Sequence, residues 1–210
     1  KCRSDKQHMT DRVRAILLAG GESRRMGVCK QTLPLGGKPV IVHCVDVLTE
    51  AGVVDITVVV GKYGSVIRQA LGNLKVDLIE HGLTDADMAD SVRTGLSAMG
   101  RLPAGVMICL SDHPLVTPET IGTLLTTQRV FPGDILIPGH RNRNGHPVIF
   151  PSELLAPIHQ GGTLRDIIQA NPERIRRIPV DDSGVIMDMD TPEDYQLILR
   201  QNTILYNHTR

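Results

Sequence analysis

A glycine-rich loop with three cationic side chains carries the clearest chemistry in the chain. It follows an apolar run, Val13 to Leu18, and reads Ala19-Gly20-Gly21-Glu22-Ser23-Arg24-Arg25-Met26-Gly27-Val28-Cys29-Lys30. Glycine lets backbone N–H groups approach a ligand closely, and arginine and lysine add positive charge. At the end of a strand this combination predicts a polyphosphate site. Its spacing matches neither G-x-x-x-x-G-K-[ST] nor G-x-G-x-x-G.

Three carboxylates that follow later apolar runs are candidate metal ligands. Asp112 comes just after the apolar run 106–110, and Asp188 and Asp190 lie two apart on a segment predicted to be extended, so they would share one face. Magnesium is usually held by one or two carboxylates together with substrate phosphates. The structural alternatives are a turn or helix cap for Asp112, a helix cap for Asp190 and a purely structural role for Asp188.

The histidines and serines give weaker evidence for a functional site than the glycine-rich loop and the carboxylates do. Gly145-His146-Pro147 stands at the head of an apolar strand, where it could contact a substrate or simply make a turn. Because no two histidines have H-x-x-x-H or H-x-H spacing, a transition-metal site is not favoured. Ser91 and Ser111 lack a nucleophile-elbow pattern, which argues against serine hydrolysis.

Apolar runs alternate with helical repeats through the first two thirds of the chain. The predicted strands are 13–18, 55–60, 75–80, 106–110, 134–138, 147–150, 175–180 and 185–189. The predicted helices are 40–50, 65–71, 88–99, 118–128, 152–158, 163–169 and one that starts at Thr191-Pro192. His43 falls on the polar face of the first of these, which is expected to be solvated, and residues 139–146 are expected to form a polar loop. Crossover helices are what parallel strands require, so this order predicts a three-layer α/β/α sandwich with a mostly parallel sheet and a mixed edge. Ligands bind beyond the carboxyl ends of such strands, which would bring the glycine loop and the carboxylates together.

Composition excludes several classes of protein. Lys+Arg and Asp+Glu are equal at 23 each, so no basic excess supports binding to nucleic acid or to a membrane surface. No apolar run approaches the ~18 residues of a membrane span. The four cysteines form no C-x-x-C pair, which is typical of reduced cytoplasmic thiols. We expect a cytoplasmic protein with one domain over residues 9–210, a natural start at Met9, and residues 1–8 as an added or disordered tail.

With these residues assembled, the chain resembles the nucleotidyltransferases of molybdenum-cofactor maturation, a family with molybdopterin cytidylyl- and guanylyltransferase branches. The opening stretch is similar to their signature Leu-Ala-Gly-Gly-x-Ser-x-Arg-Met-Gly…Lys, matched by residues 18–27 and Lys30. Four further segments are similar: 88–96, Asp112-His113-Pro114, Gly145-His146-Pro147-Val148 and Asp188-Met189-Asp190-Thr191-Pro192-Glu193-Asp194. The resemblance covers residues 13–200.

The resemblance implies a glycosyltransferase-A-like fold, as in nucleotide-diphospho-sugar transferases, that binds a nucleoside triphosphate and Mg²⁺. The residues that would meet the base and ribose are Leu18, Ala19, Gly20 and Ser91. Those that would hold the triphosphate are Gly21, Ser23, Arg25, Gly27 and Lys30. Asp112 would bind Mg²⁺ with Asp188 or Asp190 as second carboxylate, and His146 would contact the acceptor. Arg25, Lys30 and Asp112 would form the catalytic set.

The implied reaction is attack by the terminal phosphate of molybdopterin on the α-phosphorus of CTP or GTP, with release of pyrophosphate. A molybdoenzyme or its chaperone is a candidate partner. The Ala19-Gly20-Gly21 segment is closer to the guanylyl branch, whereas the motifs at 145–148 and 188–192 are closer to the cytidylyl branch and favour CTP. Two alternatives stay open: a transferase for another small phosphate such as a sugar phosphate, and a nucleotide-binding protein or oxidoreductase without transferase activity.

Overall fold

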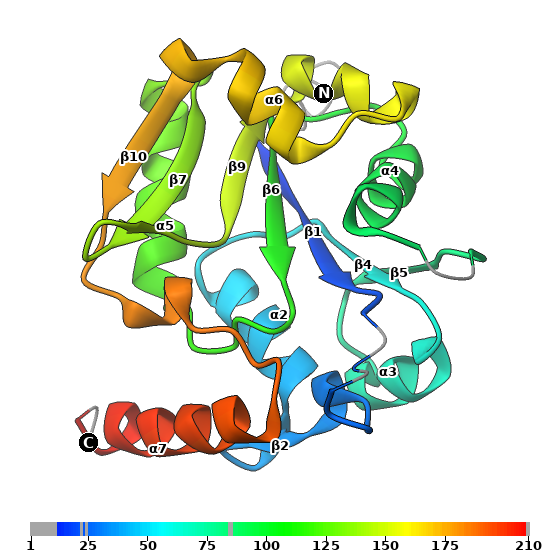
Figure 1. Cartoon of the computed structure of the whole chain (residues 1–210), viewed down its shortest axis with the longest axis vertical. Coiled ribbons are helices and arrows are strands. Elements are labelled where there is room, and N and C mark those ends of the chain that lie inside the picture. Colours follow the sequence, from blue (N-terminus) through cyan, green and yellow to red (C-terminus); the bar gives the residue numbers. More distant parts are fainter. Residues whose placement is uncertain (1–11, 22, 24, 84–85, 209–210) are drawn as a thin grey trace, which may run out of the picture.

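The structure, a computed structural model, describes residues 12–208 except 22, 24, 84 and 85 (Figure 1). The predicted tail, residues 1–8, and the predicted start at Met9 lie outside the described residues. The fold is one large sheet covered by helices on both faces, together with a short ribbon of β2 (Pro34–Leu35) and β3 (Lys38–Pro39). The three-layer prediction is confirmed.

The large sheet has the strand order β10-β7-β9-β6-β1-β4-β5, and β8 pairs with β7. The strands are β1 (Val13–Ala19), β4 (Ile56–Val60), β5 (Asp77–Glu80), β6 (Gly105–Leu110), β7 (Ile135–His140), β8 (Arg143–Asn144), β9 (Val148–Pro151) and β10 (Ile175–Pro179). β1, β4, β5 and β6 are parallel, whereas β9 runs antiparallel to β6 and β7. The sheet is therefore mixed on the β9 side, as predicted.

The helices divide between the two faces of the sheet. They are α2 (Val40–Glu50), α3 (Gly64–Leu71), α4 (Met88–Ala98), α5 (Pro118–Val130), α6 (Leu164–Ala170) and α7 (Pro192–His208), with 3-10 helices η1 (Lys30–Thr32), η2 (Ser152–Gln160), η3 (Pro172–Arg174) and η4 (Ser183–Ile186). One apolar cluster joins the sheet to α2, α3, α5 and α7, and a second joins it to α4, η2 and α6. Alternate residues of β1 enter the two clusters, Leu17 the first and Leu18 the second. This two-sided burial explains why the central parallel strands β4 and β6 are continuous apolar runs, whereas β5 and β10, at the two edges of the sheet, are not.

The predicted strand over 185–189 is wrong. The backbone there forms the 3-10 helix η4 and then an irregular segment. Asp182 starts η4 by accepting a hydrogen bond from Gly184 N at 2.8 Å, and its other oxygen accepts from Thr117 N at 2.9 Å. These bonds to a buried carboxylate override the apolar run that favours a strand.

Two smaller expectations also fail. β8 lies inside the predicted polar loop 139–146, where Arg141 (φ 46°) and Asn142 (φ 65°) make a tight hairpin turn after β7. His43, expected on the solvated face of its helix, is buried, and its ring nitrogen contacts the carbonyl of Leu35. The β2–β3 ribbon covers that face of α2, and helical periodicity alone gives no sign of it.

Candidate active site

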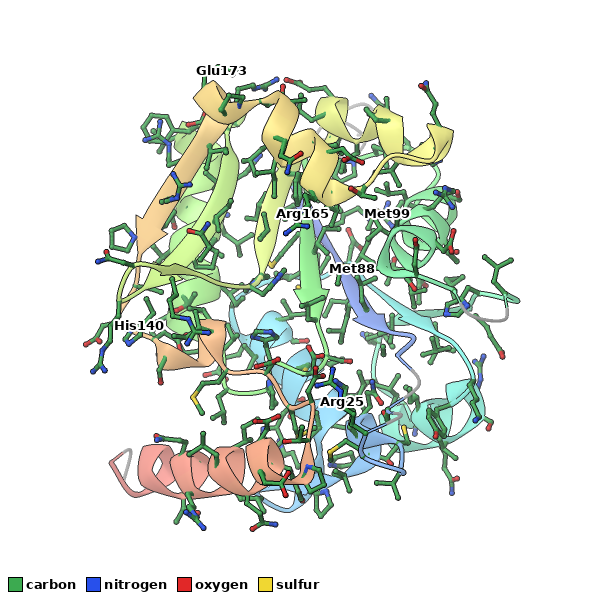
Figure 2. The ribbon with its side chains drawn as sticks, viewed as in Figure 1. Arg25, Met88, Met99, His140, Arg165 and Glu173 are labelled. Atoms are coloured by element: carbon green, nitrogen blue, oxygen red, sulfur yellow. The ribbon has the colours of Figure 1, made fainter. Side chains whose placement is uncertain are left out.

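A cleft of about 690 Å³ opens at the carboxyl ends of β1 and β6. Figure 2 shows Arg25 beyond the ends toward which these strands point, and Glu173 at the opposite end of the molecule. The predicted site residues that line the cleft are Leu18, Gly20, Gly21, Ser23, Arg25, Lys30, Ser91, Asp112 and Asp190. Ala19, Gly27, Asp188 and His146 are not part of its lining. The sheet thus brings together segments that are far apart in the sequence.

Lys30 joins the two carboxylates of the cleft. Its Nζ lies 2.8 Å from Asp112 Oδ2 and 2.9 Å from Asp190 Oδ1, and its side chain is 9% exposed. Burial works to lower the pKa of Lys30, but the carboxylate of Asp112, and then that of Asp190, outweigh it and raise the pKa above its ordinary value. The hydrogen bond from Lys30 lowers the pKa of Asp190. The cleft floor is therefore a fixed cation between two anions.

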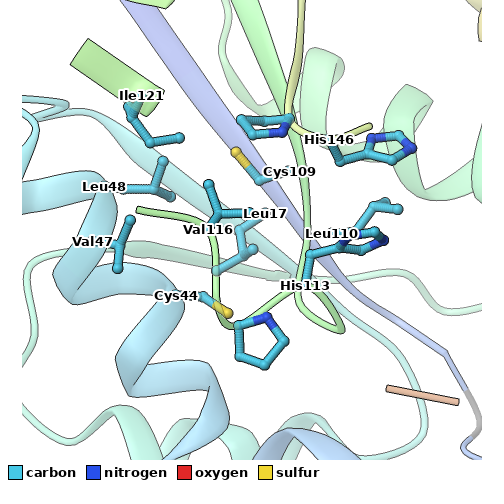
Figure 3. A pocket seen from close by; sticks show the side chains of 12 residues that line it. Leu17, Cys44, Val47, Leu48, Cys109, Leu110, His113, Val116, Ile121 and His146 are labelled. Carbon is cyan, nitrogen blue, oxygen red and sulfur yellow. The ribbon is translucent and has the colours of Figure 1, made fainter. Parts of the chain in front are cut away.

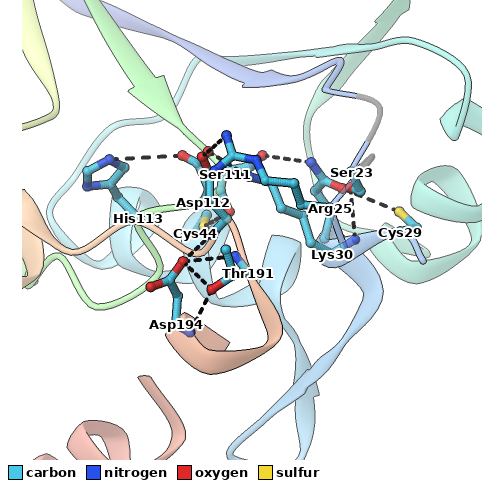
Figure 4. A network of polar contacts seen from close by, with 12 residues as sticks. Ser23, Arg25, Cys29, Lys30, Cys44, Ser111, Asp112, His113, Thr191 and Asp194 are labelled. Carbon is cyan, nitrogen blue, oxygen red and sulfur yellow. Dashed lines mark hydrogen bonds and ion pairs between the residues drawn. The ribbon is translucent and has the colours of Figure 1, made fainter. Parts of the chain in front are cut away.

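The glycine loop folds around Ser23 (Figure 4). The Ser23 carbonyl accepts hydrogen bonds from Met26 N and Gly27 N, both at 3.0 Å, and its hydroxyl accepts one from Lys30 N at 3.3 Å. Gly27 has φ +69°, a conformation that favours glycine, so its place in the loop is a turn. Arg25 reaches back with Nη2 at 3.0 Å from Asp190 Oδ2, with a side chain that is 70% exposed.

Asp112 and Asp190 are held by their surroundings rather than serving as caps. Met189 N donates to the Asp112 carbonyl at 2.9 Å, which fixes the second segment against the end of β6. Thr191 and Asp194 cap α7 themselves, with Asp194 N bonded to Thr191 Oγ1 at 3.2 Å and Thr191 N to Asp194 Oδ2 at 2.8 Å. The helix-cap alternative for Asp190 is therefore wrong, because its carboxylate faces Lys30.

A divalent cation would find two carboxylates here. Oδ1 of Asp112 is buried and has no hydrogen-bond partner among the described residues, which suits an oxygen that binds a cation. Within the described part of the chain there is no group of three or more His, Cys, Asp or Glu side chains placed to hold a metal. Asp188 is exposed and outside the cleft lining, so the pair in place is Asp112 and Asp190.

The opposite wall of the cleft is built around Gly20. A Cβ on Gly20 would lie 2.7 Å from His81 Nε2 and 3.2 Å from Ser91 Oγ, so only glycine fits there. Ser91 is buried in the first turns of α4, which Asp87 begins by accepting a hydrogen bond from Asp90 N at 2.7 Å. This wall offers a narrow, hydrogen-bonding surface beside the end of β1.

Several residues of the cleft were missed from the sequence. Gln31 is 1% exposed and its Nε2 lies 3.4 Å from Ser111 Oγ, behind Lys30. Asp87 and Met88 line the entrance. His81, whose buried ring lies against Gly20, directly follows β5, and its place just beyond a strand end was the available signal for it.

His146 lies on the other side of Asp112, next to His113. The two rings are 5.4 Å apart between centroids and line a second, apolar cavity of about 30 Å³ (Figure 3). Burial, and then the neighbouring His113, lower the pKa of His146 to about 4, so its imidazole is neutral near pH 7. The predicted acceptor residue is thus near Asp112 but outside the main cleft.

Comparison with known proteins assigns this chain to a family. Residues 15–175 match the MobA-like NTP transferase domain, and the chain belongs to that family. It is 31% identical over 163 residues to the bifunctional protein GlmU of Symbiobacterium thermophilum, across 73% of this chain and 30% of that protein. The chain covers 25% to 30% of the length of the first curated relatives it matches.

Solved structures share the fold. Rv0371c from Mycobacterium tuberculosis superposes with a TM-score of 0.80 at 23% identity, over 91% of this chain and 98% of that one, and a second structure of it is a manganese complex. A nucleotidyl transferase from Methanothermobacter thermautotroptrophicus gives a TM-score of 0.78 at 21% identity, over 92% and 99% of the two chains. The fold is that of nucleotidyltransferases. None of the described helices is long and apolar enough to cross a membrane.

Proposed function

We propose that the chain is a magnesium-dependent nucleotidyltransferase that transfers CMP or GMP from the nucleoside triphosphate to the phosphate of molybdopterin. The observation that carries the proposal is the bridge of Lys30 between Asp112 and Asp190 on the floor of a cleft bounded by the glycine loop. A buried cation and two carboxylates beside exposed backbone N–H groups suit a triphosphate with its metal.

In this proposal each wall of the cleft has one task. The base and ribose lie against Leu18, Gly20 and Ser91, and Arg25 and Lys30 face the phosphates. A phosphate oxygen of the acceptor forms a bond to the α-phosphorus while the bond from that phosphorus to the bridging oxygen breaks, and pyrophosphate leaves with the electron pair. The acceptor oxygen is already anionic, so no general base is needed. The work of the residues is alignment and charge neutralisation.

Asp112 and Asp190 would hold the magnesium ion. When bound, it supplies positive charge that offsets the phosphate oxygens. Asp112 Oδ1, which has no hydrogen-bond partner in the described part of the chain, supports this assignment, and the manganese complex of Rv0371c is in line with a divalent ion. The Asp188 carboxylate is not part of this proposal, because it is exposed outside the cleft lining.

Two further choices concern which nucleotide is used and which phosphate compound accepts it. The motifs at 145–148 and 188–192 favour CTP, whereas Ala19-Gly20-Gly21 favours GTP, and we expect CTP to be preferred. A sugar phosphate is the second candidate acceptor, because a relative at 31% identity is a GlmU protein and not a molybdenum-cofactor enzyme by name. Either acceptor presents a phosphomonoester to the same side of Asp112. A cytoplasmic location is part of the same proposal.

Pyrophosphate release tests the proposal directly. The purified chain is incubated with Mg²⁺, with CTP or GTP, and with molybdopterin or a panel of sugar phosphates. We expect turnover with molybdopterin, and a loss of about 10²–10³-fold for Lys30→Met and for Asp112→Asn. Lys75→Met and Asp181→Asn, at exposed positions, are the matched controls. Wild-type turnover in both cleft variants would refute the site, and turnover with sugar phosphates alone would replace the acceptor.

A further inference from the structure

Gln31 is a buried polar side chain of the cleft to which the proposed chemistry gives no task. It directly follows Lys30 and is 1% exposed, although glutamine lies mostly on protein surfaces. Its amide makes two hydrogen bonds to side chains: Nε2 donates to Ser111 Oγ at 3.4 Å, and Oε1 accepts from Cys29 Sγ at 3.4 Å. Because both polar atoms of the buried amide are bonded, the side chain is held in one orientation.

Two successive residues of η1 contact two successive residues at the end of β6. Lys30 Nζ lies 2.8 Å from Asp112 Oδ2, and Gln31 Nε2 lies 3.4 Å from Ser111 Oγ. All four residues line the same cleft. Figure 4 shows Ser111 next to Asp112, and Lys30 on the side of the glycine loop. The bond from amide to hydroxyl is therefore a second link, beside the ion pair, between the same two segments.

The end of β6 is the firmly held partner in this link. Ser111 is 3% exposed, and its N–H donates to the Leu18 carbonyl at 3.1 Å, which continues the pairing of β1 with β6 by one residue. The Ser111 carbonyl accepts a hydrogen bond from Cys44 Sγ of α2 at 3.7 Å. Burial raises the pKa of Cys44 to about 12, so the thiol keeps the proton that it donates. Ser111 is thus fixed both to the sheet and to the helix behind it.

η1 is the weakly held partner. It has only three residues, and its turn is closed by bonds from Thr32 N to the Cys29 carbonyl at 3.1 Å and from Leu33 N to the Lys30 carbonyl at 3.3 Å. Short 3-10 helices have poor hydrogen-bond geometry. The flexible four-carbon stem of Lys30 does little to fix the backbone that carries it. The position of η1 therefore depends on bonds to the rest of the fold.

We infer that Gln31 is a positioning residue: through Ser111 it fixes η1 against the end of β6 and so holds the Lys30 ammonium beside Asp112. The inference rests on the proposed function and deepens it, since Lys30 is the buried cation that faces the phosphates. A misplacement of about 1 Å can cost about 10²-fold in rate. With 1% of its surface exposed, Gln31 acts on the alignment of Lys30 and not on the substrates.

Nuclear magnetic resonance of the lysine side chains tests the positioning directly. The full chain is labelled with ¹³C at the ε-carbon of lysine, and the Lys30 signal is the one missing in Lys30→Met. We expect two separate ε-proton signals for Lys30 in the wild type, because its ammonium is held between two carboxylates, and one averaged signal in Gln31→Met. The Lys38 signal, from an ammonium paired with Asp46, should be the same in both proteins. Unchanged Lys30 signals in Gln31→Met overturn the inference.

Pyrophosphate release gives the second readout. Gln31→Met keeps the approximate volume of the side chain and removes its amide, so the rate should fall by about 10-fold, mainly in kcat and not in the KM for the nucleotide. Ser111→Ala should have the same effect, and the double variant should lose no more than either single variant, because each change removes the same contact. Gln169→Met and Ser65→Ala, at exposed positions, are the matched controls. Losses that multiply in the double variant contradict the positioning role.

Two checks separate the positioning role from the proposed function. The variants are compared at a temperature at which circular dichroism shows them folded. If Gln31→Met does not fold, Ser111→Ala decides alone, and wild-type Lys30 signals in it overturn the inference. A wild type that turns over neither CTP nor GTP refutes the proposed function, and the Lys30 signals then still decide the role of Gln31. Wild-type turnover together with unchanged Lys30 signals in Gln31→Met refutes only the positioning role.

Discussion

The two sides of the Asp112 side chain differ in electrostatic environment. On one side a cation, Lys30, lies between the carboxylates of Asp112 and Asp190, and Arg25 adds a second positive charge. On the other side, among the described residues, the ring of His113 comes no closer to a charged group than 4.0 Å from Asp112 Oδ1, and burial keeps His146 neutral near pH 7. A triphosphate needs strong neutralisation, whereas an acceptor must be oriented and its product released. The contrast predicts different responses to substitution on the two sides.

The largest effect is expected from Asp190 on the charged side. Asp190→Asn removes the carboxylate that Lys30 and Arg25 share, and turnover should fall by about 10²-fold or more. Asp188→Asn, two residues away and exposed, should stay within about 2-fold of the wild type because it removes no group from the cleft. Pyrophosphate release at saturating nucleotide measures both. Equal losses in the two variants would show that the charge of the segment matters and not the position of Asp190.

On the neutral side, acid should destabilise the protein through His146. Its pKa is about 4 in the folded chain and about 6.5 when unfolded, so between these values the unfolded chain binds a proton that the folded chain does not. The contribution of His146 to the free energy of unfolding is fully present above pH 6.5. It is lost as the pH drops toward 4, which lowers the free energy of unfolding by about 3 kcal/mol over the whole window.

Urea unfolding between pH 7 and pH 4 measures this dependence. His146→Gln should flatten the slope, because glutamine does not titrate, and His159→Gln should not. A slope that is the same in the wild type and in His146→Gln would mean that the imidazole is not held neutral by its apolar surroundings.

A substitution at Gly20 tests whether the glycine loop must pack closely against His81 and Ser91 to bind the nucleotide. In Gly20→Ala the new Cβ meets the buried His81 ring, so the loop must shift and the nucleotide should bind about 10-fold more weakly. Gly82→Ala adds a Cβ with nothing within 4 Å and serves as the control. Affinity for CTP and GTP by calorimetry is the measurement. Unchanged affinity in Gly20→Ala would remove this wall from the nucleotide site.

The smallest effect concerns the stability contributed by Arg25. Its pair with Asp190 is exposed on the arginine side, so Arg25→Gln should change the free energy of unfolding by no more than about 0.5 kcal/mol. Chemical denaturation measures this. A loss above about 1 kcal/mol would show that the arginine holds the loop, rather than being free to meet a phosphate.

The central part of the site could be predicted from the sequence because the buried parallel strands are visible in it as short apolar runs. The runs that became β1 and β6 are buried on both faces, and the sheet rule places whatever follows them at one edge. Asp112 and the glycine loop are found that way. The resemblance added Ser91, which periodicity alone does not distinguish from other residues of its helix.

The rest depended on tertiary contacts that no local pattern contains. Asp188 and Asp190 look equivalent on an extended segment, but η4 and the bond from Met189 N to the Asp112 carbonyl turn only Asp190 into the cleft. His113 looks like an ordinary loop residue until its ring is seen beside that of His146. His43 looks solvated because the ribbon that covers it comes from an earlier part of the chain.

The segment that carries Asp190 has a consequence for how the site can be assembled and altered. The family match ends at residue 175, near the start of β10, and Asp190 lies beyond it. That segment is tied back by the bond of Tyr195 Oη to the Pro34 carbonyl at 2.6 Å and by Ile198 in the core. A chain cut after β10 would contain every strand of the sheet and the whole glycine loop, yet only one of the two carboxylates. The charge balance around Lys30 is therefore completed by a segment beyond the last strand, which also adds Ile198 to the core of the sheet.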